Sequence, residues 1–482
     1  MKNFDSKTKK AARSEQRKAA EQKKKIVKIS IISVVAVILC AAIVFGAVWG
    51  VKYWQDSGNF LRTKVAVKSD NYKVDDAMLS YQFYTFYDEI YSSLGTYGIS
   101  NNSSLKSQTF YSNYTWFDYL MNSVVNQVAE YVYYCEWGKA NSVPFTDETK
   151  ADIDSDIELM KENAEEDGIS FDEYLVSNYG RGVKEKDVRN MLEIQYYGQI
   201  CHDAFAEAHE ATDEQITAYY NAHKDDFTYA SVISYSLENV NYDAVKASLA
   251  KVDSYDAYKA YITTYLLGKG KSEDEAKETV DALVPTDICA ANEGEIVDFA
   301  FADDAKVGNT IAISESDNSV SIYYLSELAH RYDYKLKNVR HILLKTDEDA
   351  DKEVTLKKAQ SLLDEYLEDP TEDNFIAICK DNSEDTTASN GGLIADIAKG
   401  NYVKPFEDWC FDEERKPGDT GIVESTYGYH IMYFVNEGEE KWSLDVADAI
   451  LAEAESELAN SFTVKFDEEK LASVPGDVRV KK

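Results

Sequence analysis

Cysteine and proline are scarce in this chain, which has six of each among 482 residues. The cysteines form no C-x-x-C pair or other spacing typical of a metal or redox site, so we expect small buried side chains. The low proline content and 22 glycines exclude a linker-dominated or fibrous chain. Hydrophobic residues make up 44% of the sequence, which is enough for two to four folded domains.

Basic residues are also in short supply, because 51 Lys and Arg stand against 87 Asp and Glu, for a net charge of −36. So acidic a protein is a poor ligand for nucleic acid, whose phosphates must be neutralised by Lys and Arg. The average hides an asymmetry. Residues 1–28 carry 11 basic against three acidic side chains, or +8, which leaves −44 for the rest.

One long apolar run lies between these parts, the 23 uncharged residues 29–51. About 20 such residues cross the hydrocarbon core of a bilayer, so we predict a transmembrane helix. The basic tail 1–28 predicts a cytoplasmic N-terminus and export of the rest. A cleaved signal peptide and a lipoprotein cysteine at Cys40 are the alternatives. Both are disfavoured, because no small-residue cleavage site follows the run and the residues before Cys40 are bulky. Of the six cysteines, the five after Cys40 would be exported, and an odd number cannot all pair internally.

Residues 60–227 show apolar and aromatic side chains at helical spacings of three and four. Capping boxes at Ser170 with Glu173 and at Thr212 with Gln215 predict helix starts. This segment holds 18 of the 35 tyrosines. Two interpretations stay open for them: a buried core stripe, or an amphipathic surface that cradles unfolded peptides.

An α+β pattern follows residue 227, with two successive units of strands and helices. The first covers 228–330 and includes a helix at Ser272–Leu283; the second begins at Tyr334. Residues 298–327 align without gaps to 408–437 at an offset of 110, which predicts a domain duplication. An amphipathic C-terminal helix over 443–475 is expected to pack back on the helical domain.

Four motifs in the second unit carry its chemistry. They are Val339-Arg340-His341-Ile342-Leu343-Leu344, Asn382-Ser383-Glu384-Asp385 with Gly391-Gly392, Val403-Lys404-Pro405-Phe406-Glu407, and Tyr427-Gly428-Tyr429-His430-Ile431. Together they resemble a parvulin-type peptidyl-prolyl cis-trans isomerase, and the resemblance covers 335–437. With the anchor and helical segment, the chain looks like the exported foldases of the PrsA and SurA type, which act on unfolded exported polypeptides with X-Pro bonds.

The resemblance implies the site residues. Two facing histidines match His341 and His430, and the third polar position matches Asp385. Gly428 stands where a hydroxyl-bearing residue is common, so Tyr427 is assigned to supply that hydroxyl. The apolar slot for the proline ring matches Ile394, Tyr402 and Phe406. The chemistry needs no metal or cofactor, because the enzyme only has to bind the twisted amide better than its planar forms.

The expected architecture is therefore an α+β multidomain protein of a single-membrane bacterium, with a transmembrane helix, a helical chaperone-like domain, an inactive parvulin-like copy, an active parvulin domain and a C-terminal helix. The copy at 228–330 should be inactive, since the alignment places Ser234 at the position of His341 and Val320 at that of His430. The acidic loop 346–351 disfavours phosphorylated substrates. The segment Leu393–Ile397 departs from the family's Asp-Leu-Gly-aromatic continuation. This favours the alternative function, a holdase whose parvulin domain binds peptide without significant isomerase activity.

Overall fold

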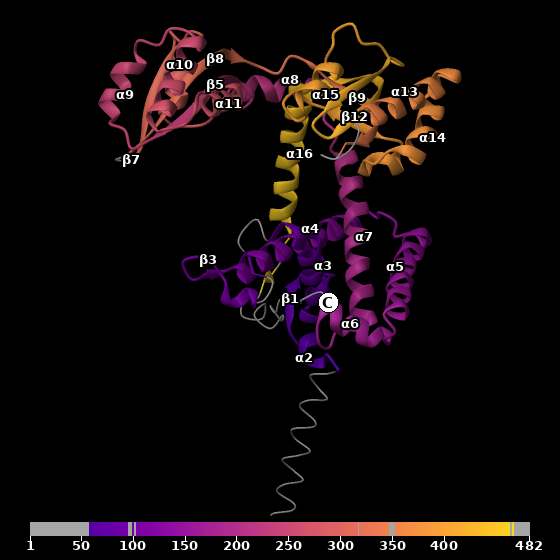
Figure 1. Ribbon diagram of the computed structural model, residues 1–482. Coiled ribbons are helices and arrows are strands. Elements are labelled where there is room, and N and C mark those ends of the chain that lie inside the picture. Colours follow the sequence, from indigo (N-terminus) through magenta and orange to yellow (C-terminus); the bar gives the residue numbers. More distant parts are fainter. Residues whose placement is uncertain are drawn as a thin grey trace, which may run out of the picture. The chain divides into compact units, whose positions relative to one another are not determined.

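The computed structural model describes residues 57–94, 99–100, 103–316, 318–346, 352–462 and 465–466. The predicted basic tail and apolar run 29–51 lie outside these residues, as does most of the acidic loop 346–351. Within the described ranges, no helix is both long and apolar enough to cross a membrane. The chain divides into two compact units, Met1–His209 with Ala454–Lys482, and Glu210–Glu453 (Figure 1).

The first unit is mainly helical, as its spacing predicts. Its elements are α2 (Asn59–Arg62), β1 (Val65–Lys68), β2 (Lys73–Asp75), α3 (Asp76–Leu94), the 3-10 turn η2 (Leu105–Ser107), β3 (Thr109–Tyr111), β4 (Tyr114–Thr115), α4 (Trp116–Ala140), α5 (Asp147–Glu166), α6 (Phe171–Tyr179) and α7 (Glu185–Ala208). The predicted capping box of Ser170 and Glu173 is present at the start of α6. A short antiparallel sheet has the order β13-β1-β2, where β13 is Lys465–Phe466.

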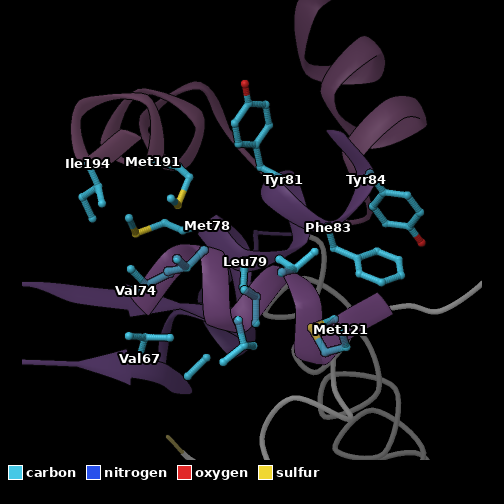
Figure 2. Packing of buried hydrophobic residues seen from close by; sticks show 14 of the residues in the cluster. Val67, Val74, Met78, Leu79, Tyr81, Phe83, Tyr84, Met121, Met191 and Ile194 are labelled. Carbon is cyan, nitrogen blue, oxygen red and sulfur yellow. The ribbon is translucent and has the colours of Figure 1, made fainter. Parts of the chain in front are cut away.

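Part of the tyrosine stripe in this unit is core. Tyr84, Tyr87 and Tyr134 are at most 3% exposed. They come from α3 and α4, which pack with α7 around one apolar cluster (Figure 2). Aromatic burial of this kind dominates the stability of a helical core. A smaller group of aromatic residues before and at the start of α4 stays exposed.

The second unit begins with α8 (Asp213–Ala222), capped by Thr212 and Gln215 as predicted, and the 3-10 turn η3 (Lys224–Phe227). Its first α+β copy contains β5 (Tyr229–Glu238), α9 (Tyr242–Leu249), α10 (Tyr255–Gly268), α11 (Glu273–Asp281), β6 (Thr286–Cys289), α12 (Glu295–Ala300), β7 (Thr310–Ser316) and β8 (Ser319–His330). The second copy contains β9 (Lys335–Lys345), α13 (Lys352–Glu368), α14 (Glu372–Asn382), η4 (Thr386–Asn390), β10 (Leu393–Ile397), α15 (Lys404–Cys410), β11 (Thr420–Ser425) and β12 (Gly428–Glu440).

Both copies have the same sheet topology. Their antiparallel strand orders are β6-β5-β8-β7 and β10-β9-β12-β11. In each copy, longer helices pack on one face of the sheet and a short helix, α12 or α15, packs on the other. Equal strand order together with equal layering supports the duplication that the sequence repeat predicts.

The register corrects one detail of the gap-free repeat. Strand β7 has a bulge between Ser314 and Ser316, so it is one residue longer than β11. The offset therefore falls from 110 in β7 to 109 in β8, and Ser321 occupies the position of His430. Val320 instead packs in the cluster on the opposite, helix-covered face.

The other assignment in the first copy agrees with the register. Ser234 pairs with Tyr323 across the central strands, as His341 pairs with Met432 in the second copy. The first copy thus has two serines where the second has two histidines.

The C-terminal helix is shorter than the predicted 443–475. Helix α16 runs from Lys441 to Ser461, and Lys465–Phe466 then pair with β1 as an edge strand.

Candidate active site

The two predicted histidines meet on one face of the second sheet. His341 on β9 and His430 on β12 are only 4% and 5% exposed. Their Nδ1 atoms lie 3.1 Å apart, and the rings are nearly parallel at an interplanar angle of 17°. The strands themselves create this contact, because His341 pairs with Met432 and His430 pairs with Leu343. The histidines are therefore diagonal neighbours on adjacent strands, within reach of long side chains.

Asp385 reaches the outer nitrogen of this pair. Its Oδ1 lies 3.4 Å from His341 Nε2. Asp385 is the N-cap of η4, and both the backbone N–H and the hydroxyl of Thr387 donate hydrogen bonds to the same Oδ1, at 2.9 and 2.6 Å. The Thr387 hydroxyl oxygen also lies 3.3 Å from His341 Nε2. The carboxylate is thus held in place by its own turn.

The double glycine brings this turn against β9. Gly391 and Gly392 have φ values of 64° and 71°, in the left-handed region that glycine tolerates best. The N–H of His341 donates to the carbonyl of Gly392 at 2.9 Å. A Cβ on Gly392 would overlap the backbone oxygen of His341, so the second glycine permits this close approach.

A serine, not the predicted tyrosine, completes the polar chain. Ser425 Oγ, at the end of β11, lies 2.7 Å from His430 Nε2 and accepts a hydrogen bond from the Tyr427 N–H at 3.1 Å. The side chain of Tyr427 is 62% exposed on the hairpin turn, and the structure does not bring its hydroxyl to the histidines. Sequence reasoning missed both Ser425 and Thr387. For Ser425, the signal in the sequence was the strand alternation that puts position 425 opposite Gly428. For Thr387, it was the Asp-x-Thr turn that begins at Asp385.

The three predicted slot residues lie together beside the histidines. Phe406 on α15 is 2% exposed, and its ring centroid lies 5.6 Å from that of His341 and 5.4 Å from that of His430. Tyr402 stacks on Phe406 at 5.2 Å and is 37% exposed. Ile394 on β10 packs against the same apolar cluster. An aromatic wall open to solvent at Tyr402 thus adjoins the polar chain.

Burial sets the charge state of the site. It lowers the pKa of His430 to about 4, with the neighbouring His341 adding to the effect. Burial also lowers the pKa of His341, although Asp385 opposes that shift. Burial alone would raise the pKa of Asp385, but the Thr387 hydrogen bonds and His341 outweigh it and lower this pKa. At neutral pH the site therefore holds an ionised carboxylate beside two neutral imidazoles.

These charges define one consistent direction for the hydrogen bonds. Since the Thr387 hydroxyl donates to Asp385, His341 Nε2–H must donate toward the carboxylate. His341 Nδ1 then accepts from His430 Nδ1–H, and His430 Nε2 accepts from the Ser425 hydroxyl. This tautomer assignment follows from the network.

Within the described part of the chain, no three His, Cys, Asp or Glu side chains are placed to hold a metal ion.

Comparison with known proteins places this site in a family. Residues 341–436 match the family described as "Rotamase: PPIC-type PPIASE domain". Foldase protein PrsA 1 of Listeria monocytogenes serotype 4b is 34% identical over 122 residues, which cover 25% of this chain and 37% of that protein. Foldase protein PrsA 3 of Bacillus anthracis is 31% identical over 144 residues, or 30% of this chain and 46% of that protein. The chain thus spans less than half the length of these curated relatives.

Solved structures of similar proteins include PrsA from Bacillus anthracis and from Bacillus subtilis. The first is 13% identical, with a TM-score of 0.19, and the match covers 75% of this chain and 100% of that chain. The second is 12% identical, with a TM-score of 0.23, and the match covers 79% of this chain and 95% of that chain. By the family match over 341–436, the second α+β copy is similar to PPIC-type PPIase domains.

Proposed function

We propose that this chain is a peptidyl-prolyl cis-trans isomerase that also assists the folding of exported proteins as a membrane-anchored chaperone. The observation that carries the isomerase proposal is the buried, neutral pair of His341 and His430 against the ring of Phe406. In the proposal, His341, Asp385 and His430 are the catalytic set, Ser425 takes the role predicted for Tyr427, and Ile394, Tyr402 and Phe406 bind the proline ring.

The geometry suits the chemistry of prolyl isomerisation. Rotation about the X-Pro bond is opposed by amide resonance, with a barrier of about 18–20 kcal/mol. The planar amide is the more charge-separated form, so a dry pocket stabilises it less than it stabilises the twisted, less conjugated form. Phe406 excludes water from one side, and the histidines are uncharged, so neither presents a full charge to the amide. Binding of the proline ring in the slot can thus stabilise the twisted amide more than the planar one.

Membrane attachment and export are part of the proposal. The 23-residue apolar run 29–51 after a basic tail supports a single-pass anchor with a cytoplasmic N-terminus. Two relatives named as foldases support a role with unfolded polypeptides. The acidic sequence of the loop 346–351 supports non-phosphorylated substrates, since a phosphate would be repelled there.

The remaining domains have proposed roles as well. We assign the helical residues 60–209 of the first unit to chaperone activity and the copy at 228–330 to a non-catalytic role; the predicted helical segment 60–227 extended beyond the end of this unit at His209. The serines at positions 234 and 321 support the latter assignment. The C-terminal helix is proposed to pack on the helical domain, supported by the hydrogen bond from the Tyr134 hydroxyl to Glu455 Oε1 at 2.8 Å.

A protease-coupled assay on an Ala-Pro peptide tests the isomerase proposal. The full chain in detergent should accelerate isomerisation, and His430→Ala should lower kcat/KM by about a hundredfold, the usual contribution of one well-placed polar group. Circular dichroism would verify that the variant is folded. Equal rates for the two proteins, both near background, would refute an enzymatic role.

A holdase without significant isomerase activity is the alternative, and one feature of β10 favours it. In the segment that departs from the family pattern, Asp396 has a φ of 52° and the register with β9 shifts between Ile394 and Ile397. This bulge alters the strand that carries Ile394. Slowed aggregation of an unfolded client by both wild type and His430→Ala, with no isomerase activity in either, would support the alternative.

A further inference from the structure

An exposed aromatic patch stands on the first unit, away from the buried tyrosine core. The β3–β4 hairpin and the start of α4 contribute Phe110, Tyr111, Tyr114, Trp116 and Tyr119, which we call the hairpin patch. Tyr111 is 77% exposed, and Phe110 and Tyr119 are 43% exposed each. Exposed apolar clusters of this kind usually mark a surface that contacts another phase or partner.

The patch is rigid rather than a loose loop. Phe110 stacks on Tyr119 with centroids 4.6 Å apart and meets Trp116 edge-on at 4.7 Å. The hairpin is fixed to α4 by the capping box of Thr115 and Asp118. Trp116 is partly buried against the core, and these contacts hold the rings of Phe110 and Tyr119 in an exposed position. The arrangement therefore favours contact with something outside this unit.

The charge around the patch is unusual for this chain. Residues 103–119 contain one acidic side chain, Asp118, and one lysine, whereas α5 has nine Asp and Glu among its 20 residues. An anionic bilayer surface repels acidic segments such as α5 and tolerates a neutral or weakly basic one. Tyrosine and tryptophan are also the residues that partition to the membrane–water interface.

The proposed anchor also makes the bilayer the surface nearest to the first unit. If residues 29–51 span the membrane, seven residues separate that run from α2, a reach of at most about 25 Å. Helix α2 is tied to the unit through Arg62, whose guanidinium forms a bidentate ion pair with the buried Asp187 of α7. With the proposed anchor, the first unit would lie within about 25 Å of the lipid surface.

We propose that the hairpin patch inserts its aromatic side chains into the lipid headgroup interface and orients the first unit on the membrane. This inference rests on the proposed membrane anchor. The hairpin then serves as a second, reversible contact beside the transmembrane helix, while acidic surfaces such as α5 face the solvent.

A fluorescent reporter on the hairpin turn tests the proposal. An environment-sensitive dye is placed on Asn113→Cys in the full chain, with Cys40→Ser and Cys289→Ser; Cys135, Cys201, Cys379 and Cys410 are buried. The chain is reconstituted into vesicles of phosphatidylcholine and phosphatidylglycerol, with and without brominated acyl chains. We expect a blue shift and quenching by brominated lipid. The same dye on Glu158→Cys of α5 should show neither.

Tyr111→Glu supplies the second variant, because so exposed a side chain can be replaced without disturbing the fold. It should return the reporter at position 113 to its aqueous spectrum while the chain stays with the vesicles. A reporter that is aqueous in floated wild-type chain overturns the hairpin proposal and leaves the anchor intact. A chain that fails to float overturns the anchor. A reporter that responds to unfolded polypeptide or to chain concentration, and not to lipid, also overturns the hairpin proposal.

Discussion

His341 and His430 are joined by a hydrogen bond between their Nδ1 atoms, 3.1 Å apart, in which the neutral ring of His430 donates to the neutral ring of His341. The bond links two strands of the sheet and joins Asp385 at one end to Ser425 at the other. A change at either end should therefore alter the tautomer of the pair and, with it, the polarity presented to the substrate. This coupling makes the site testable at positions distant from the proline slot.

Ser425→Ala should lower isomerase activity by about tenfold, because it removes the hydroxyl that donates to His430 Nε2 and leaves a buried acceptor unsatisfied. Ser425→Thr keeps the donor and should retain most of the activity. The protease-coupled assay measures both variants. In addition, the imidazole ¹⁵N shifts should show that His430 changes tautomer in the alanine variant alone.

Tyr427→Phe is the matched control for that experiment. The sequence-based assignment gives Tyr427 the hydroxyl of the site, whereas its side chain is 62% exposed and that of Ser425 contacts the histidine. We expect Tyr427→Phe to have wild-type activity. A large loss in this variant with none in Ser425→Ala would restore the original assignment.

The site should lose stability in mild acid. The folded chain holds His430 at a pKa of about 4, below its ordinary value of 6.5, because burial disfavours the charged ring. The unfolded state therefore binds more protons than the folded one between these two values. The contribution of such a histidine to the free energy of unfolding is therefore fully present above pH 6.5. It falls as the pH drops toward 4, by up to about 1.4 kcal/mol per pH unit for each such histidine.

Hydrogen exchange of the β9 and β12 amides measures this loss locally, without requiring the whole chain to unfold in one step. Protection should fall from pH 7 to pH 5 after correction for intrinsic exchange. His430→Asn removes one of the two titrating rings and should flatten the profile. Unchanged pH dependence in that variant would show that other groups control acid stability.

The order of elements in both copies follows from the sequence, but the register does not. Alternating runs at Val320–Leu325 and His430–Val435 correctly predict β8 and β12. The gap-free repeat nevertheless places Val320 at the position of His430, because nothing in the local composition reveals the bulge at Ser314–Ser316. A shift of one residue in a strand turns every side chain to the other face.

The site shows the same limit. His341, His430 and Phe406 are embedded in motifs and are found from sequence, and the structure brings them together. Ser425 and Thr387 are ordinary hydroxyl residues in a hairpin and a turn, so only the fold reveals that they bond the histidines. Tyr427 shows the converse, since a residue with suitable chemistry points to solvent.

Gly392→Ala should destabilise the second copy more than the same substitution does at a left-handed glycine with open space around it. The new Cβ would meet the carbonyl oxygen of His341 in addition to the strain of a φ near 71°. Gly400 is the control, because it has a φ of 90° and no heavy atom within 4 Å of its would-be Cβ. Gly400→Ala should cost about 1–2 kcal/mol. Hydrogen exchange of β9 should show a larger loss for Gly392→Ala, and equal losses would argue against the close approach.

Arg340→Gln should lower kcat while leaving KM nearly unchanged. Arg340 is 12% exposed by its side chain; its Nε donates to Glu372 Oε1 at 2.8 Å, and its Nη1 donates to the carbonyls of Asn390 and Gly391 at 3.0 and 3.1 Å. It thus holds the turn that carries Asp385 and lies apart from the proline slot. Loosening that turn should cost about tenfold in kcat through misplacement of the carboxylate.

Arg340→Lys keeps the charge near Glu372 but loses the planar fork that also bonds the two carbonyls, so it should recover activity only in part. Lys404→Gln is the matched control, since Lys404 is exposed and pairs with Asp408 on its own helix. A proportional rise in KM with no fall in kcat would show that Arg340 shapes the slot instead of positioning Asp385. The pH profile separates the two roles further, because displacement of Asp385 removes an influence that raises the pKa of His341 and should shift the acid limb of kcat to lower pH.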